Sequence, residues 1–236
     1  MSRLPAYAVH ILTASGVVFG FLSLIAVIEG DRLWAFTWLG ISFLVDGIDG
    51  PLARWLRVKE RTPEIDGGSM DYVIDFFTFV VIPAVMIWRW DLVPDGWVLI
   101  TASAVLLAGC YSYANANFKT SDFYFVGFPA IWSLLLWYLV VLGAGQMTTL
   151  IIVLVCGGLT FVPTAYVHPF RVTFMRPVLV VASLLWVVSV AWLTWGILGQ
   201  GNTALAMPLA SLILLITSLI FAGISIYRSA VGSQIG

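Results

Sequence analysis

Charged residues are so sparse in this sequence that long uncharged runs dominate it. Four such runs cover Leu4 to Ile28, Gly96 to Phe118, Phe123 to Phe170 and Pro177 to Tyr227. About 20 apolar helical residues cross the hydrocarbon core of a bilayer, so the first two runs predict one membrane span each. The last two runs contain 48 and 51 residues, and each has a polar, Gly-containing stretch near its middle. Each of them therefore predicts two spans joined by a tight turn.

Two shorter uncharged runs, Leu33 to Val45 and Phe76 to Trp88, contain 13 residues each. A helix of that length measures only about 20 Å, so each run crosses a membrane only if its helix continues through the neighbouring aspartates. With that continuation, the sequence predicts an all-α integral membrane protein of eight helices. They cover residues 8–28, 33–54, 69–90, 96–116, 124–142, 148–167, 178–197 and 205–227.

The charge content argues against a soluble domain. Only 10% of the residues are charged, whereas roughly a quarter are charged in soluble domains. Eight spans leave only short loops, so we expect residues 1–236 to form a single membrane-embedded domain. We expect no nucleic-acid partner.

Basic residues are divided unequally between the two sides of the predicted bundle. Nine fall on one side, namely Arg3, Arg54, Arg57, Lys59, Arg61, Lys119, Arg171, Arg176 and Arg228, and two fall on the other, Arg32 and Arg89. Membrane proteins place most Lys and Arg of their short loops in the cytoplasm. We therefore expect both termini and the nine basic residues on the cytoplasmic side.

Four aspartates lie inside or at the end of predicted spans, where an ionisable group costs at least about 2.5 kcal/mol. Asp46 and Asp49 are three residues apart, and Asp71 and Asp75 are four apart, so each pair projects from one face of its helix. The second helix runs towards the cytoplasm and the third runs back, which places both pairs at a similar depth. Carboxylate oxygens suit hard divalent ions such as Mg²⁺ or Mn²⁺. The pattern predicts a metal site near the cytoplasmic surface.

Simpler interpretations exist for the same residues. The carboxylates could reach the membrane surface or pair with Arg54 and Arg57. Gly47, Gly50 and Ala53 leave one side of the second helix almost without side chains, which suits either a ligand near the backbone or close helix packing. The residues alone leave these alternatives open.

The aspartates belong to a longer motif. It reads Asp46-x2-Asp49-Gly50-x2-Ala53-Arg54, then twelve residues, then Gly67-x3-Asp71-x3-Asp75. This motif, at residues 46–75, closely resembles the signature of the CDP-alcohol phosphotransferases, integral membrane enzymes that make phospholipids from a CDP-linked precursor and an alcohol. The twelve-residue spacer is longer than in most members and resembles the branch that makes phosphatidylcholine in bacteria.

Further stretches resemble that branch. They are Val9-His10-x2-Thr13-Ala14-x-Gly16, Phe123-Tyr124-Phe125-Val126-Gly127-Phe128-Pro129 entering the fifth helix, and His168-Pro169-x-Arg171 after the sixth. The resemblance implies that CDP-diacylglycerol is the donor, choline the acceptor and CMP the second product. It also implies a multi-pass enzyme among the lipids of the bacterial cytoplasmic (inner) membrane, with its active site towards the cytoplasm.

The resemblance assigns roles to single residues as well. Two divalent ions, Mn²⁺ or Mg²⁺, are expected on Asp46, Asp49, Asp71 and Asp75, with Asp71 and Asp75 at the catalytic centre and Asp75 as general base. The CDP group is expected to contact Thr13, Asp46, Asp49, Gly50, Ala53, Arg54 and Gly67.

Choline recognition is expected to involve aromatic rings, because a quaternary ammonium offers no hydrogen-bond donor. The candidates are Tyr111, Tyr113, Asn115 and Tyr166. Residues at alternate positions of one helix point in different directions, so the first three cannot all face one pocket. Each aromatic candidate also has an interpretation as a packing or membrane-interface residue.

Alternative functions remain open at this stage. Another acceptor, such as serine, glycerol 3-phosphate or inositol phosphate, fits the same signature. A phosphorylated acceptor needs basic residues, and only Lys119, Arg171 and Arg176 are available outside the spacer. A divalent-cation transporter also carries intramembrane carboxylates, usually near the midplane on two related repeats. Apolar helix faces and small residues also allow a homodimer.

Overall fold

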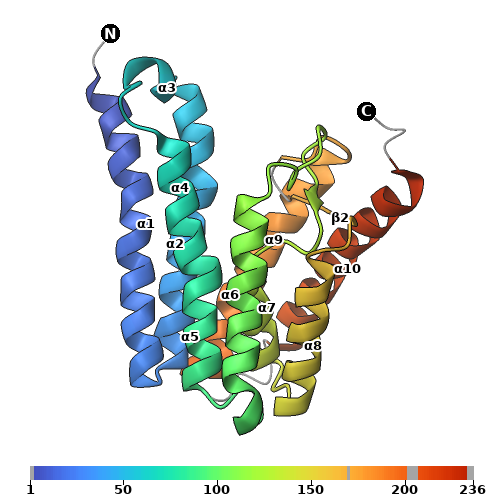
Figure 1. Cartoon of the computed structure of the whole chain (residues 1–236). Coiled ribbons are helices and arrows are strands. Elements are labelled where there is room, and N and C mark those ends of the chain that lie inside the picture. The colour runs from blue at the N-terminus through green and yellow to red at the C-terminus, as the bar shows by residue number, and fades with distance from the viewer. Residues whose placement is uncertain (1–2, 169–170, 201–206, 233–236) are drawn as a thin grey trace.

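The computed structural model describes residues 3–168, 171–200 and 207–232, and it is built almost entirely of helices (Figure 1). The elements are α1 (Leu4–Glu29), α2 (Arg32–Trp55), α3 (Val58–Arg61), α4 (Gly67–Phe76), the π-helix η1 (Phe77–Val81), α5 (Ile82–Arg89), the 3₁₀ turn η2 (Asp95–Trp97), α6 (Val98–Ala114), β1 (Phe125–Val126), α7 (Trp132–Val141), α8 (Gln146–Leu159), β2 (Ala165–Tyr166), α9 (Arg176–Leu193), the π-helix η3 (Thr194–Gly199) and α10 (Met207–Val231).

Within the described residues, and apart from the single-turn helix α3, the helices form eight rods, because η1 joins α4 to α5, η2 leads into α6 and η3 extends α9. The predicted all-α membrane architecture is therefore confirmed. Five rods are long and apolar enough to cross a membrane: Leu4–Glu29, Gly67–Arg89, Asp95–Ala114, Arg176–Gly199 and Met207–Val231. The turn predicted at Gly201 and Asn202, and the first two positions of the predicted eighth helix, lie outside the described residues.

Two predicted spans are wrong in extent. The helix expected over residues 124–142 begins only at Trp132, and the one expected over 148–167 ends at Leu159. With 10 and 14 residues, α7 and α8 measure about 15 and 21 Å, which is less than the bilayer core. Two residues of each lost stretch pair instead, as the antiparallel strands β1 (Phe125–Val126) and β2 (Ala165–Tyr166), and the others form loops.

Gly127 explains why this segment leaves the helical path. Its φ is +78°, and a Cβ there would collide with the backbone carbonyl of Thr160 at the end of α8. Only glycine tolerates both conditions without strain. Pro129 follows two residues later and disfavours helical backbone before it. The chain therefore turns at residue 127 and reaches α7 as a loop.

Close packing on α1 sets the position of the rod that contains α4. A Cβ at Gly16 would lie 3.1 Å from Ile74, and one at Gly20 would lie 2.9 Å from Thr78. Figure 1 shows α1, α2 and the α4–α5 rod side by side, with α6 next to α5 and α9 paired with α10. This arrangement brings the signature segments of α2 and α4 together beside α1.

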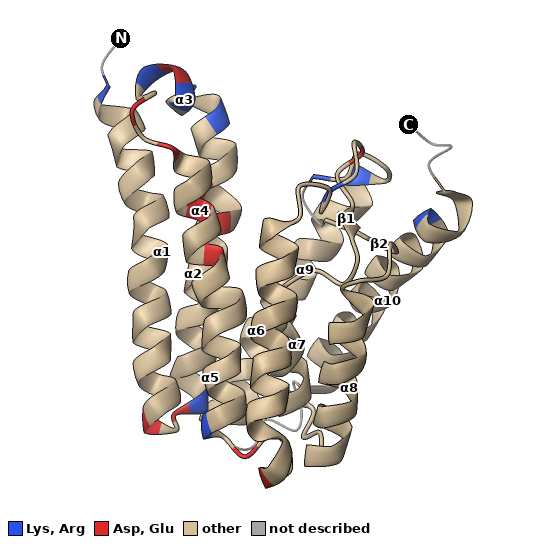
Figure 2. Ribbon diagram, viewed as in Figure 1, with Lys and Arg blue, Asp and Glu red and all other residues tan. Residues whose placement is uncertain are grey.

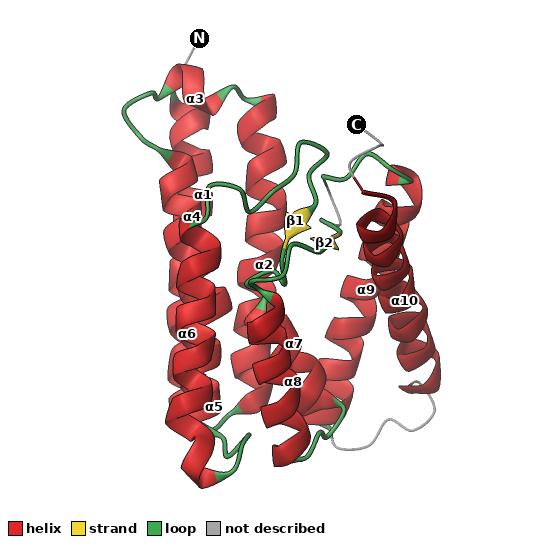
Figure 3. Cartoon of the chain, turned by 45° about the vertical axis from the view of Figure 1, so that its right-hand side comes forward, coloured by secondary structure: helices red, strands yellow, loops and turns green. Residues whose placement is uncertain are grey.

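Two loops cover the space between the bundle and α10 at the end that holds α3 (Figure 3). We call them the cap, which consists of residues 115–131 and 160–168. The β1–β2 pair joins the two loops, with Phe125 opposite Tyr166. The amide of Val167 donates to Ser225 Oγ at 3.0 Å, which joins the cap to α10.

The tight contact between α6 and η1 yields a stability prediction. A Cβ at Gly109 would collide with Val80, which is completely buried. We expect Gly109→Ala to lower the free energy of unfolding by about 1–3 kcal/mol, because overpacking displaces the helix. Thermal unfolding of detergent-solubilised protein measures this, with Gly158→Ala as the control because its Cβ would meet no atom within 4 Å. Equal stability of the two variants would contradict the packing argument.

Candidate functional site

The signature aspartates converge at the interface of α1, α2 and α4. Asp46, Asp49 and Asp71 each offer one carboxylate oxygen, and these three oxygens lie within 4.8 Å of one another. Asp75, one turn further along the α4 rod, lines the same small cavity of about 10 Å³. Figure 2 shows the acidic positions of α2 and α4 inside the bundle, in the half that carries α3 and the cap.

The ion pairs recorded among the described residues do not involve this cluster. Among residues 3–168, 171–200 and 207–232, Arg3 pairs with Glu64 and Arg228 pairs with Asp122 within 4.0 Å, and neither pair involves a signature aspartate. Arg54 and Arg57 therefore form no such pair with the carboxylates, contrary to the simpler interpretation. Asp49 is only 6% exposed, and a buried charge without a partner is strongly unfavourable. An acidic all-oxygen set of this kind fits a divalent cation.

A helix cap fixes the start of α4 and hence the depth of its aspartates. Asp66 Oδ1 accepts hydrogen bonds from the amides of Gly68 at 3.0 Å and Ser69 at 3.3 Å. Ser69 Oγ donates to Asp66 Oδ2 at 2.6 Å. The helix therefore begins at Gly67, so Asp71 projects from its second turn. The preference of Asp for this position was available in the sequence, but Asp66 was not among the predicted site residues.

Gly67, the first residue of α4, lies next to the His10 ring of α1. A Cβ at Gly67 would lie 3.3 Å from the His10 ring, so glycine permits this approach. His10 is buried, and its Nε2 shares a hydrogen bond of 2.9 Å with Thr62 Oγ1. The histidine thus ties α1 to the turn that precedes α4, which is a structural role.

Side chains from α1 and α2 complete the cavity wall. Thr13 and Gly16 line it from α1, and Ser42 lines it from α2. Ser42 Oγ donates to the Gly16 carbonyl at 3.2 Å, which fixes the two helices beside the carboxylates. Thr13, a predicted CDP contact, therefore lies in the same cavity as the aspartates.

The small residues of α2 divide into two groups. A Cβ at Gly47 would meet no atom within 4 Å, and one at Gly50 would meet only Arg54 of the same helix. Ala53 instead packs against a small apolar cluster formed by α1 and Val58. Close helix packing therefore explains Ala53, whereas the backbone at Gly47 and Gly50 stays accessible to a ligand.

One of the four choline candidates lies beside the aspartate helix. The ring of Tyr113 lies 6.0 Å from that of Tyr72 and 5.8 Å from that of Phe76, and both partners are neighbours of Asp71 or Asp75 in α4.

The other candidates have different surroundings. The Tyr111 ring packs on Phe161 at 4.7 Å, and Tyr166 packs on Phe128 at 5.9 Å. Asn115 Oδ1 accepts a hydrogen bond from the Asn117 amide at 3.0 Å. The four candidates are therefore not brought together.

The cap places a lysine in the field of the carboxylates. Lys119 Nζ lies 4.6 Å from the ring centre of Phe118 and 5.2 Å from that of Phe125. Burial and the charge of Arg171 lower the pKa of Lys119, whereas the charge of Asp75 raises it. Phe118 in turn packs against Tyr72 of α4 at 6.1 Å.

Sequence reasoning identified Lys119 only as one of few basic residues, and it did not single out Phe118 or Phe125. Their grouping depends on the β1–β2 pair, in a segment where the sequence predicted helices. The nearest signal in the sequence was that Lys119 directly follows Phe118, the last residue of the uncharged run from Gly96 to Phe118.

Comparison with known proteins identifies relatives over most of the chain. A phosphatidylcholine synthase from Pseudomonas aeruginosa is 36% identical over 230 residues, which cover 98% of this chain and 94% of that protein. Phosphatidylcholine synthases from Mesorhizobium japonicum and Rhizobium meliloti are 39% and 38% identical, over 85% and 78% of this chain and 73% and 77% of theirs. No family model matches the sequence.

Proposed function

The chain belongs to the phosphatidylcholine synthase family, and we propose that it joins choline to the phosphatidyl group of CDP-diacylglycerol, with release of CMP. The observation that carries this proposal is that one carboxylate oxygen each from Asp46, Asp49 and Asp71 lie within 4.8 Å of one another. The resemblance to the CDP-alcohol phosphotransferase signature implies metal ligands at these positions. Relatives of this name support choline as the acceptor.

The carboxylates are well suited to hold divalent ions. Asp46, Asp49 and Asp71 would bind one ion, and Asp75 would complete a second site in the same cavity. Bound Mn²⁺ or Mg²⁺ supplies positive charge that neutralises the pyrophosphate and the departing CMP. The backbone of Gly47 and Gly50 leaves room for the nucleotide next to these ligands.

Asp75 is the best placed general base. It lies outside the tight group of three carboxylates but faces the same cavity. In the proposed reaction, the choline hydroxyl oxygen forms a bond to the phosphorus that carries the diacylglycerol, and its proton passes to Asp75. The bond from that phosphorus to the bridging oxygen breaks, so CMP leaves with the bond electrons. A base must lie within hydrogen-bond reach of the hydroxyl, and the place of Asp75 in the wall of this cavity supports that role.

An apolar cavity next to the carboxylate cavity suits an acyl chain of the donor. It measures about 250 Å³ and shares Thr78 and Phe79 with the carboxylate cavity. Its wall follows α2 from Phe36 to Leu44, which is about 12 Å of helix. One acyl chain can therefore lie within the bundle while the headgroup reaches the aspartates.

We propose that the carboxylate end faces the cytoplasm of a bacterium, in its inner membrane. Basic residues gather at that end, around α3, the cap and the end of α10, and a smaller group lies at the other end (Figure 2). This asymmetry agrees with the positive-inside rule. Choline and CMP are soluble, so a site near the membrane surface exchanges them with the cytoplasm. The expected homodimer stays a prediction, and light scattering of the purified protein measures it.

The acceptor is tested with a panel of alcohols. Purified protein with Mn²⁺ and CDP-diacylglycerol should convert labelled choline to phosphatidylcholine and release an equal amount of CMP. Serine, glycerol 3-phosphate and inositol phosphate should give at most a small fraction of that rate. A faster reaction with one of them would reassign the acceptor, and absence of CMP with every alcohol would refute the transferase.

The metal role is tested by removing ligands and ions. Asp46→Asn, Asp49→Asn, Asp71→Asn and Asp75→Asn should each reduce turnover by about 100-fold or more, because charge stabilisation at the reacting phosphate is lost. Chelation should abolish the wild-type activity, and Mn²⁺ or Mg²⁺ should restore it. Asp95→Asn, in η2 at the other end of the bundle, is the matched control. Near-normal turnover in any of the four variants would remove that residue from the site.

A further inference from the structure

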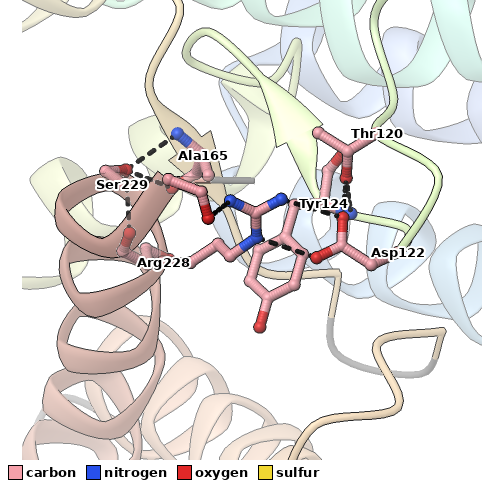
Figure 4. A network of polar contacts seen from close by, with 8 residues as sticks. Thr120, Asp122, Tyr124, Ala165, Arg228 and Ser229 are labelled. Atoms are coloured by element: carbon pink, nitrogen blue, oxygen red, sulfur yellow. Dashed lines mark hydrogen bonds and ion pairs between the residues drawn. The ribbon is translucent and has the colours of Figure 1, made fainter. Parts of the chain in front are cut away.

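A partly buried ion pair joins the cap to the last helix. Arg228 Nε of α10 donates to Asp122 Oδ2 at 2.8 Å, and its Nη2 donates to Oδ1 at 3.3 Å. The two side chains are only 12% and 18% exposed. Figure 4 shows the guanidinium directed from α10 into the loop that carries Asp122. A bidentate pair of this kind fixes orientation as well as distance.

The loop around Asp122 is itself tightly ordered. Thr120 Oγ1 donates to Asp122 Oδ1 at 2.5 Å, and the Thr120 amide donates to the Tyr124 carbonyl at 2.8 Å. The Tyr124 amide donates back to Thr120 Oγ1 at 2.9 Å, and the Arg228 guanidinium lies 5.5 Å from the Tyr124 ring centre. Figure 4 shows these groups as one connected network. Movement of Asp122 therefore moves the whole turn.

Further contacts hold Arg228 and the second cap loop in place. Arg228 Nη1 donates to the Gly232 carbonyl at 2.5 Å, so three of its nitrogens have acceptors. Ser229 Oγ accepts from the Ala165 amide at 2.9 Å. The hydrogen bond from Arg228 holds the pKa of Asp122 below its usual range, so the Asp122 carboxylate is charged at neutral pH.

The ordered turn begins directly after Lys119. The Lys119 ammonium lies over the Phe118 and Phe125 rings, and Phe118 contacts Tyr72, the neighbour of Asp71. A free lysine side chain samples many rotamers and loses conformational entropy when it is fixed. The aromatic rings and the turn reduce that freedom. Lys119 thus directly precedes the hydrogen-bonded turn that the ion pair joins to α10.

We propose that Asp122 and Arg228 are positioning residues that hold Lys119 beside the carboxylates, where its ammonium binds the pyrophosphate of CDP-diacylglycerol. This inference rests on the proposed function. The aspartates with their ions bind one side of the pyrophosphate, and Lys119 approaches it from the cap. The ion pair then adds to the Ser225 and Ser229 contacts through which α10 holds the cap in place for the donor.

A double-mutant cycle tests whether Arg228 acts through Lys119. Lys119→Met should lower kcat/KM for CDP-diacylglycerol by roughly 10-fold to 100-fold, because a charge-assisted contact to phosphate is lost. Arg228→Met should lower it by at least about 5-fold. The Lys119→Met/Arg228→Met variant should be no worse than Lys119→Met alone, since Arg228 acts through the lysine. The KM for choline should change little in all three variants.

Controls separate positioning from a general loss of stability. Arg228→Lys keeps the charge without the bidentate geometry and should recover part of the activity, whereas Arg89→Met at the other end of the bundle should leave it unchanged. Hydrogen exchange should accelerate at residues 115–128 in Arg228→Met while α1 and α2 remain protected. Losses that multiply in the double variant, or normal kinetics in Arg228→Met, would overturn the proposal.

The two proposals fail in different ways. A wild-type protein that makes no phosphatidylcholine refutes the proposed function. The positioning role is then tested by hydrogen exchange alone, and unchanged hydrogen exchange at residues 115–128 in Arg228→Met refutes it.

Discussion

Mutual repulsion among four carboxylates within a membrane bundle is the constraint on which this structure depends. Asp46, Asp49 and Asp71 bring oxygens within 4.8 Å of one another, and Asp75 faces the same cavity. Within the described residues, no Lys or Arg pairs with them at 4.0 Å or less. Divalent ions would supply the positive charge that these carboxylates need, and an anion such as pyrophosphate would then be attracted to them.

Several features of the architecture bring these carboxylates together. Glycines at positions 16 and 20 let the α4 rod approach α1, and the Asp66 cap sets its start. The open backbone at Gly47 leaves space on α2 beside the carboxylates. The apolar cavity that shares Thr78 and Phe79 with the carboxylate cavity, and the cap, complete the surroundings of the site. A lipid donor and a soluble acceptor can therefore meet there.

Much of this could be predicted from local patterns. Hydropathy and spacing place six of the eight rods to within a few residues, and the paired aspartates identify the cluster. The cap could not be predicted, because its shape depends on the Phe125–Tyr166 strand pair and on the Arg228–Asp122 ion pair. In each pair the two residues lie far apart in the sequence. Apolar content near residues 124–131 suggested a helix, but the backbone required at Gly127 overrides it.

The central claim is that the carboxylate cluster binds divalent ions, and electron paramagnetic resonance of purified protein titrated with Mn²⁺ tests it most directly. We predict two bound ions per chain with a spin-coupled signal, and loss of that signal in the Asp46→Asn/Asp71→Asn variant. Unchanged Mn²⁺ binding in this variant, or absence of bound Mn²⁺ in the wild type, would contradict the account.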